Sequence, residues 1–192
     1  MYVLVACEES QEVCKAFRNR GHEAYSCDYQ ECSGGHPEWH IRGNATDILD
    51  WDWDMIIAHP PCTYLTSSSA MRLFNKDHNI NEERYNKGIR AVEFFMRIYE
   101  CDCPKIAIEN PTPMKIFDLP QYTQIIEPYM FGDPWKKRTC LWLKGLPKLV
   151  SANPVSPTGT WVGNNSYGGH RSPKIRSKTF PAIARAMAEQ WG

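Results

Sequence analysis

The sequence predicts an α/β fold in which a mostly parallel sheet is flanked by helices. Three observations support this prediction. Short apolar runs alternate with helical patterns through the first half of the chain, as they do in proteins built from strand-helix-strand units. Two of the apolar runs end abruptly in turns that contain proline. The longest helical pattern lies between those two runs.

The first strand, helix and second strand are expected at residues 3–6, 9–20 and 23–27. The apolar run at 3–6 is typical of a buried strand. Ser10 is expected to cap the helix, because a serine side chain accepts hydrogen bonds from the first free N–H groups. Gly21 is expected to end it, because glycine readily adopts the backbone turn that follows a helix.

Two later strands end at turns that carry reactive side chains. Residues 54–58 form an apolar run that stops at a His-Pro-Pro-Cys turn, where two prolines prevent a helix from following directly. Residues 105–108 form another strand, which runs into a Glu-Asn-Pro turn. Open α/β sheets bind ligands at the carboxyl ends of their strands, so we expect Cys62 and Glu109 to share one crevice.

The remaining elements complete one domain over residues 1–192. A long amphipathic helix is expected over 82–100 and a short strand over 139–143. Residues 146–173 are rich in Gly, Pro, Ser and Asn and predict a long loop, which is often functional in a compact domain. The final helix is expected over 181–190, with Pro181 in its first turn.

The bulk composition excludes several classes of protein. No apolar run is long enough for a membrane span. Residues 1–6 are typical of a strand and not of a signal peptide, because no basic leader precedes them. The eight cysteines are scattered, which indicates free thiols in a reducing compartment. We therefore expect a cytoplasmic protein with no membrane partner, and the sequence leaves its oligomeric state open.

Charge is balanced overall, with 22 basic and 22 acidic residues, but it is unevenly distributed. From Lys136 to Arg185 the chain has no Asp or Glu. The cations in this block are Lys136, Lys137, Arg138, Lys144, Lys148, Arg171, Lys174, Arg176, Lys178 and Arg185. Such a block favours a phosphate-bearing partner, and the alternative is a solvated basic face.

Pro61-Cys62 after one strand and Glu109-Asn110 after another resemble the cytosine-5 DNA methyltransferase family, which pairs a Pro-Cys nucleophile loop with a Glu-Asn loop. The resemblance implies a Rossmann-like class I methyltransferase fold, S-adenosylmethionine as cofactor and cytosine in DNA as substrate. Carbon 5 of a pyrimidine is too weak a nucleophile to take a methyl group unaided. A thiolate that adds to carbon 6 activates it, and a carboxyl group at N3 supports the charge shift. Cys62 is thus the expected nucleophile and Glu109 the expected acid.

The resemblance extends in order over nearly the whole chain. Residues 2–17 resemble the family's first strand, cofactor loop and helix, and residues 177–181 resemble its last motif. Arg138 resembles the arginine that helps to hold the base. The implied cofactor contacts are Ala6, Cys7, Glu8, Ser10, Asp28, Asp47, Ile48 and Pro60. The implied substrate contacts are Pro61, Tyr64, Asn110, Lys136 and Lys137, with Tyr64 stacking on the base.

Two stretches depart from the family's pattern and leave alternatives open. Residues 7–10 stand where the family has a glycine-rich turn, so the close approach of the backbone to a cofactor is lost or remodelled. The long target-recognition region is reduced to residues 146–173. The substrate is therefore either DNA, held by phosphate contacts, or a free pyrimidine nucleotide. A third interpretation is a nucleotide- or nucleic-acid-binding protein that kept the fold without methyl transfer.

One cluster of metal-ligand types falls in a short segment. Its members are Cys27, Cys32, His36 and His40. Zinc uses such side chains, but the spacings are loose, Cys27 is expected in a strand, and no second pair of cysteines completes the pattern. No metal is therefore expected, and zinc at these four residues remains the alternative.

Overall fold

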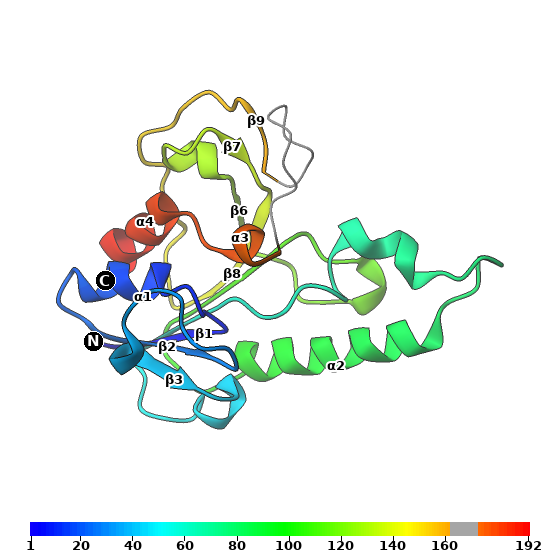
Figure 1. The fold of residues 1–192 in the computed structure, drawn as a ribbon, viewed down its shortest axis with the longest axis horizontal. Coiled ribbons are helices and arrows are strands. Elements are labelled where there is room, and N and C mark those ends of the chain that lie inside the picture. The colour runs from blue at the N-terminus through cyan, green and yellow to red at the C-terminus, as the bar shows by residue number, and fades with distance from the viewer. Residues whose placement is uncertain (162–172) are drawn as a thin grey trace.

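The computed structural model describes residues 1–161 and 173–192, and a seven-stranded sheet forms its centre (Figure 1). The strands lie in the order β3-β2-β1-β4-β5-β8-β6. They are β1 (Tyr2–Ala6), β2 (Glu23–Asp28), β3 (His40–Arg42), β4 (Met55–Ala58), β5 (Ile106–Asn110), β6 (Gln124–Ile126) and β8 (Thr139–Lys144). Neighbours from β3 to β5 run parallel, and β8 is antiparallel to both of its neighbours. The predicted α/β fold with a mostly parallel, Rossmann-like sheet is confirmed.

The direction in which strands are added reverses at β1. The chain builds β2 and β3 on one side of β1, and then returns to add β4 on the other side. In this pairing Val3 lies opposite Met55 and Ala6 lies opposite Ala58. The carboxyl ends of β1 and β4 therefore flank the point where strand order reverses, which is where open α/β sheets form a ligand crevice.

Helices cover both faces of the sheet (Figure 1). α1 (Glu12–Arg18) and α4 (Pro181–Trp191) pack together on one face, over a core that includes Val3 and Val5. α2 (Glu82–Tyr99) lies on the other face, where its Phe95 packs into a core with Leu4. Side chains alternate along a strand, so successive residues of β1 supply the two separate cores.

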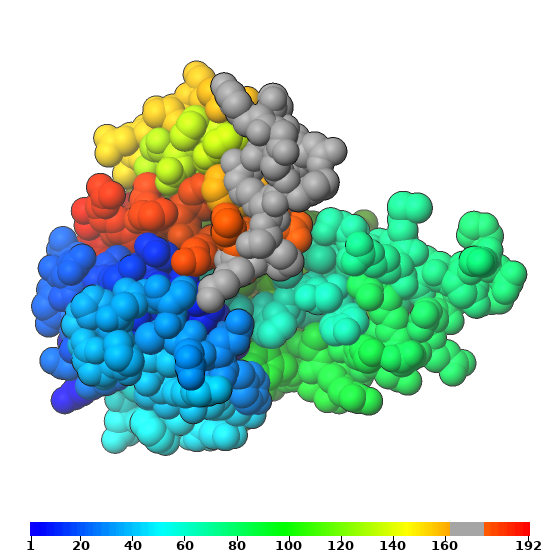
Figure 2. All heavy atoms as spheres, viewed as in Figure 1, coloured from blue at the N-terminus to red at the C-terminus, as the bar shows by residue number. Residues whose placement is uncertain are grey.

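Residues 63–95 form an arm that projects from the body of the molecule (Figures 1 and 2). The arm contains the 3-10 helix Ser67–Leu73 and most of α2. Its small core comprises Leu65, Leu73, Met114 and Phe117. Gly88 of α2 packs so closely that a Cβ atom there would lie 2.1 Å from Cζ of Phe117. The arm is thus packed against the segment that follows β5.

The first helix differs from its prediction. It spans Glu12–Arg18 and not residues 9–20, and Ser10 does not cap it. The carboxylate of Glu8 accepts the hydrogen bonds of the first turn, from the N–H groups of Val13 at 2.7 Å and Cys14 at 3.1 Å. A buried carboxylate from the preceding loop therefore takes the place that was assigned to a serine cap.

The other predicted elements lie within a few residues of those observed. β5 runs on through Glu109 and Asn110, which were expected in a turn, because both residues pair with β8. Within 146–173, predicted to be loop, β9 (Gly159–Thr160) pairs with β7 (Trp135–Lys136). Gly163, Asn164, Asn165, Gly168 and Gly169 of that loop lie outside the described residues. The short helix α3 (Pro173–Ser177) precedes α4.

Candidate active site at the carboxyl edge of the sheet

Cys62 and Glu109 meet at the edge where β4 and β5 end. These strands are parallel neighbours, and Ala58 pairs with Ile108. Glu109 is therefore only one residue beyond the paired position, and Cys62 follows β4 by four residues. The negative charge of Glu109 contributes to the pKa shift of Cys62, as expected of close neighbours. Both residues therefore lie at the same edge of the sheet, as the sharing of one crevice requires.

Hydrogen bonds join the loop after β4 to the end of β5 and the segment that follows it. The carbonyl of Cys62 accepts hydrogen bonds from the N–H groups of Leu65 and Thr66, both at 3.0 Å. Met114 N–H donates to the carbonyl of Leu65 at 2.7 Å. The side-chain amide of Asn110 donates to the carbonyl of Pro60 at 3.4 Å. Asn110 thus braces the Pro-Pro-Cys turn, while its Oδ1 atom is buried without a hydrogen-bond partner among the described residues.

The Cys62 side chain is partly exposed and protonated at neutral pH. Burial raises the pKa of its thiol, the charge of Glu109 raises it further, and the cations Lys137 and Arg176 lower it in part. The result is a pKa above the ordinary value of a cysteine. Cys62 must therefore lose its proton before it can act as a nucleophile.

Glu109 forms an almost buried ion pair with His59. Nδ1 of His59 lies 2.8 Å from Oε2 of Glu109, and the two side chains are 12% and 11% exposed. Burial alone raises the pKa of Glu109, but the hydrogen bond from His59 and the charge of Lys137 outweigh it and lower the pKa. Burial acts to lower the pKa of His59. The negative charges of Glu109 and Glu8 outweigh this effect, so the pKa is raised.

Glu8 supplies a second buried carboxylate, close enough for its charge to act on His59. It is 4% exposed and is fixed by the first turn of α1. Burial raises its pKa, while the charge of His59 and the N–H groups of Val13 and Cys14 lower it in part. Glu8 was expected to contact a cofactor, and in this structure its carboxylate points to the helix that follows it.

The cation beside Glu109 is Lys137 and not Arg138. Lys137 lines a small pocket together with Glu109, Thr179 and Phe180, and its ammonium lies 5.9 Å from the centre of the Phe180 ring. Arg138, expected to hold the base, is exposed, as is Lys136. Lys137 is half-buried, whereas Arg138 beside it is exposed.

The basic block does not form one face. Lys144 donates to the carbonyl of Cys101, at the opposite edge of the sheet. Lys178 donates to the hydroxyl of Ser33 at 3.4 Å. The charge of Arg176 in α3 reaches Cys62. Arg171 and the side chain of Lys174 lie outside the described residues.

Tyr64, expected to stack on a base, is half-buried beside the arm. The guanidinium of Arg84 lies 5.0 Å from the centre of its ring, and the ammonium of Lys87 lies 6.0 Å away. Arg84 also donates to the carbonyl of Thr63 at 3.1 Å. Cations therefore cover the Tyr64 ring here, and stacking of a base requires that they give way or stack with it.

The residues expected to hold a cofactor follow β1, β2 and β3. Cys7 has a φ of 60°, the left-handed conformation that glycine usually supplies. The turn is thus remodelled, since a cysteine makes the bend. The charge of Asp28 helps to raise the pKa of Cys7, after burial, to about 12. Asp47 is exposed, and its neighbour Ile48 is buried.

These residues fit S-adenosylmethionine in chemistry and in place. Carboxylates suit ribose hydroxyl groups and the apolar Ile48 suits the face of an adenine. They gather at the carboxyl ends of β1 and β2, beside the point where strand order reverses. Pro60 and Pro61 follow β4 at the same edge, with Pro60 buried and Pro61 exposed. Ala6 and Ser10 are buried, so of these two only the backbone is expected to reach a ligand.

The four candidate zinc ligands do not converge. Cys27 is buried in β2, and its thiol points to the carbonyl of Gly43. His40 bonds to Ser26 Oγ at 2.9 Å and to the carbonyl of Gln30 at 2.8 Å, so both ring nitrogens have partners. Among the described residues no group of three or more His, Cys, Asp or Glu side chains is arranged to hold a metal.

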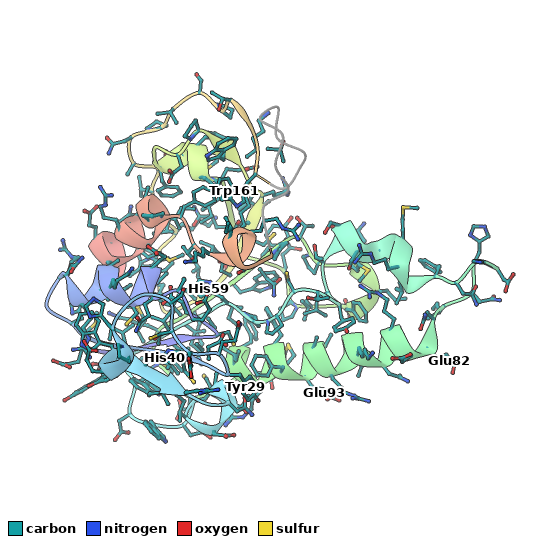
Figure 3. The ribbon with its side chains drawn as sticks, viewed as in Figure 1. Tyr29, His40, His59, Glu82, Glu93 and Trp161 are labelled. Carbon is teal, nitrogen blue, oxygen red and sulfur yellow. The ribbon has the colours of Figure 1, made fainter. Side chains whose placement is uncertain are left out.

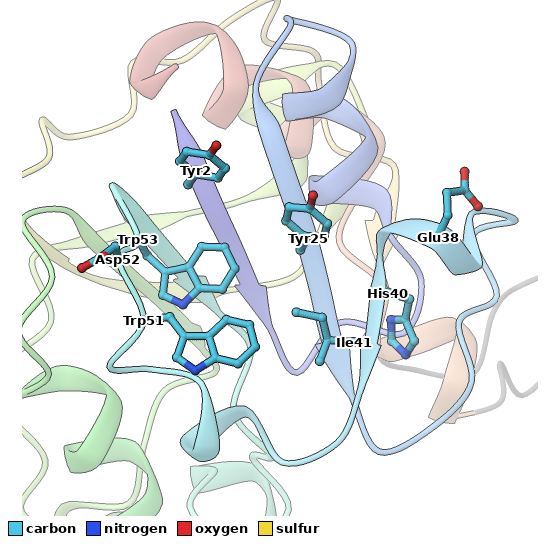
Figure 4. A pocket seen from close by; sticks show the side chains of 8 residues that line it. All are labelled: Tyr2, Tyr25, Glu38, His40, Ile41, Trp51, Asp52 and Trp53. Atoms are coloured by element: carbon cyan, nitrogen blue, oxygen red, sulfur yellow. The ribbon is translucent and has the colours of Figure 1, made fainter.

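A more open pocket lies elsewhere, on the α2 side of the sheet near β3 (Figure 4). It has a volume of about 430 Å³. The side chains that line it are Tyr2, Tyr25, Glu38, His40, Ile41, Trp51, Asp52 and Trp53. Trp51 stacks on Trp53 with 6.0 Å between ring centres. This aromatic pocket contains carboxylates but no cysteine that could act as the nucleophile.

His59 is the one site residue to which the sequence assigned no role. Figure 3 places it near the centre of the molecule, whereas Glu82 marks the far end of the arm. Its position directly after a buried strand, two residues before the Pro-Cys pair, was the available signal. The partner Glu109 lies 50 residues away, so the pairing itself is visible only in the folded chain.

Within the described residues, the structure contains no helix that is long and apolar enough to cross a membrane. Comparison with protein-family models and with curated proteins finds no match for this chain.

Proposed function

We propose that this protein transfers a methyl group from S-adenosylmethionine to carbon 5 of cytosine, with DNA as the substrate. The observation that carries the proposal is the arrangement of Cys62 and Glu109 at the ends of adjacent strands β4 and β5. A nucleophile and a carboxyl group at one edge match the two roles that carbon-5 chemistry needs. The resemblance to cytosine-5 methyltransferases rests on the same two positions.

In the proposed reaction, Cys62 loses its proton and its sulfur forms a bond to carbon 6 of the ring. The electron pair of the C5–C6 double bond then becomes available at carbon 5, and N3 gains a proton from Glu109. Carbon 5 takes the methyl group and loses its own proton to solvent. The bond between sulfur and carbon 6 then breaks, and N3 returns its proton.

S-adenosylmethionine supplies an electrophilic methyl group on a sulfonium. Residues of this chain that would hold it are the backbone of Ala6 and Cys7, the carboxylates of Asp28 and Asp47, and Ile48. Because these residues lie beside the end of β4, a cofactor held by them would be next to the loop of Cys62. Glu8 stays inside the fold, where it holds α1 and faces His59.

DNA is preferred over a free nucleotide because cations lie on more than one element around the crevice. Lys137 precedes β8, Arg176 belongs to α3, and Arg84 belongs to the arm. Such spacing suits several phosphates along a backbone, whereas one mononucleotide offers phosphate at a single place. The salt dependence of binding separates the two substrates, since it is steep for a polynucleotide.

The second candidate is a binding protein without methyl transfer. It is favoured by the turn after β1, where no glycine is present and the buried Glu8 occupies the first N–H groups of α1. Calorimetry with S-adenosylmethionine distinguishes it from the enzyme. Absence of cofactor binding to the folded protein would favour this candidate.

The direct test is transfer of a labelled methyl group to duplex DNA, single-stranded DNA, deoxycytidine monophosphate and deoxyuridine monophosphate. We expect label in duplex DNA with the unmodified protein and none with Cys62→Ala. Cys101→Ala is the matched control, because this thiol lies beyond the end of α2, at the opposite edge of the sheet. Absence of label in every acceptor would reject the enzyme.

A further inference from the structure

His59 joins the two halves of the crevice. Its backbone N–H donates to the carbonyl of Ala6 at 3.0 Å, which ties the start of the Pro-Pro-Cys turn to the end of β1. Its ring lies against Glu109 at the end of β5. The residue therefore contacts both the strand that leads to the cofactor loop and the carboxyl group assigned to the base.

The hydrogen bond from His59 occupies one oxygen of Glu109. Nδ1 lies 2.8 Å from Oε2, and no hydrogen bond to Oε1 is formed by the described residues. A carboxyl group held at one oxygen cannot rotate freely, and its other oxygen is left for a ligand. Nδ1 must carry the proton of this hydrogen bond, because a carboxylate can only accept.

The opposite nitrogen of the ring is buried and lacks a partner. Nε2 of His59 forms no hydrogen bond with any described residue. A buried ring nitrogen without a partner is costly. An apolar side chain would avoid this cost, so packing alone does not account for a histidine at this position.

Two carboxylates and one cation face the His59 ring. Glu109 comes from β5, Glu8 from the loop after β1, and Lys137 from the segment before β8. Glu12 of α1 acts on Glu8 and not directly on the ring. The carboxylates favour the imidazolium and Lys137 opposes it. The balance raises the pKa of His59 above the ordinary value of a histidine.

We propose that His59 is a positioning residue that orients Glu109 and returns to it the proton that N3 of the base receives. This inference rests on the proposed function. The Nδ1 proton of His59 moves to the carboxylate of Glu109 and Glu109 passes a proton to N3, so that the ring of His59 ends neutral and Glu109 is a carboxylate again. When the bond between sulfur and carbon 6 breaks, the proton returns from N3 by the same path.

Asparagine at position 59 separates positioning from proton supply. Its side-chain amide can donate from about the place of Nδ1, but it cannot titrate. His59→Asn should therefore hold Glu109 in place without supplying a proton. His59→Ala removes both functions. A melting temperature for His59→Asn close to that of the unmodified protein separates these effects from a loss of folding.

The test combines nuclear magnetic resonance of nitrogen-labelled histidines with the pH profile of methyl transfer to duplex DNA. We expect a His59 pKa above the ordinary histidine value, which falls in Glu109→Gln. The matched control is Glu38→Gln, because Glu38 pairs in the same way with the exposed His36 at 3.1 Å. In the unmodified protein the rate should rise and then fall with pH, as the groups that must lose and keep a proton titrate.

His59→Asn should lower the rate at least about tenfold at neutral pH, and its rate should no longer decrease at high pH. His59→Ala should lower the rate further. A His59 pKa that does not change in Glu109→Gln would overturn the proposed relay, and so would His59→Asn with the rate and pH profile of the unmodified protein. If the unmodified protein transfers no methyl group while the His59 pKa falls as expected, the pairing stands and the proposed function fails together with the catalytic role of the relay.

Discussion

The crevice at the carboxyl edge of the sheet and the aromatic pocket near β3 differ in what they bury. The crevice encloses charge, since Glu8, His59 and Glu109 are all nearly inaccessible to solvent. The aromatic pocket is larger and more open, but it exposes mainly rings, with Tyr2 57% and Trp51 56% accessible. Buried ionisable groups are costly unless they are paired or used. Under the proposed function, the burial of charge and not the volume of the cavity marks the reactive site.

The largest expected effect concerns Glu109. Glu109→Gln keeps the shape of the side chain but removes its acidity, so methyl transfer should fall by about 100-fold or more. Glu38→Gln in the aromatic pocket should leave the rate unchanged. The measurement is the initial rate of labelled methyl transfer to duplex DNA. Equal losses in the two variants would erase the distinction between the two regions.

The aromatic pocket should matter for stability and not for transfer. Trp53 is 8% exposed, and its indole N–H donates to the carbonyl of Ile48 at 2.7 Å. Trp53→Ala should lower the free energy of unfolding by about 3 to 5 kcal/mol. Trp51→Ala, a matched change at an exposed ring, should shift it by about 0.5 kcal/mol or less. Urea unfolding measures both, and a large loss of transfer in folded Trp51→Ala would assign this pocket a part in catalysis.

The protonation of Cys62 should respond to Glu109. Burial and the charge of Glu109 raise the pKa of the Cys62 thiol, so its alkylation should become rapid only above the ordinary pH range for cysteine. Glu109→Gln removes a negative charge and should move that profile to lower pH. Mass spectrometry of the peptide that contains Cys62 follows its alkylation separately from the partly exposed Cys7 and Cys32. If the alkylation profile of Cys62 in Glu109→Gln moved to higher pH or did not move, the negative charge of Glu109 would not be acting on the thiol.

The smallest effect is the pH dependence of stability conferred by the buried pair. The pKa of Glu109 is lowered by His59 and Lys137 against the effect of burial. Ionised Glu109 therefore stabilises the folded protein above about pH 4.3, and this stabilisation is lost as the pH falls through the folded pKa. The pKa of His59 is raised by Glu109 and Glu8 against the effect of burial. Protonated His59 therefore stabilises the folded protein fully below about pH 6.5, and this stabilisation is lost as the pH rises through the folded pKa.

The difference in unfolding free energy between the unmodified protein and His59→Asn should therefore be greatest between about pH 4.3 and 6.5. Urea unfolding over pH 4 to 9 measures this difference. The difference in unfolding free energy between the unmodified protein and Glu38→Gln should not vary with pH, because Glu38 and His36 are exposed and solvent screens their interaction. A difference for His59→Asn that does not vary with pH would contradict the account of the pair.

Most of the sheet was predictable from sequence because β1, β4, β5 and β8 are built on short apolar runs. The convergence of Cys62 and Glu109 was also predictable, since both follow such strands. β3 and β6 were not predicted, because each has only three residues and gains its stability from a neighbouring strand. The turn after β1 could not be foreseen, since Cys7 and Gln11 adopt positive φ values that their residue types do not favour.

Roles within the site were less predictable than its position. In the run Lys137-Arg138, sequence order alone does not decide which cation faces inward; in the folded chain Lys137 lines the small pocket beside Glu109 and Arg138 is exposed. The capping carboxylate of Glu8 acts on N–H groups five and six residues further along the chain, beyond the usual spacing of a helix cap. His59 gains its role from a partner in another strand.

The central claim is that Cys62 forms a covalent bond to carbon 6 of cytosine. Duplex DNA that contains 5-fluorocytosine tests it directly, because fluorine at carbon 5 cannot leave as a proton and the adduct persists. With S-adenosylmethionine present, the account predicts a stable protein–DNA adduct on the peptide that contains Cys62, absent in Cys62→Ala and retained in Cys101→Ala. Methyl transfer to ordinary duplex DNA without any adduct on the fluorinated duplex, or an adduct on another cysteine, would contradict it.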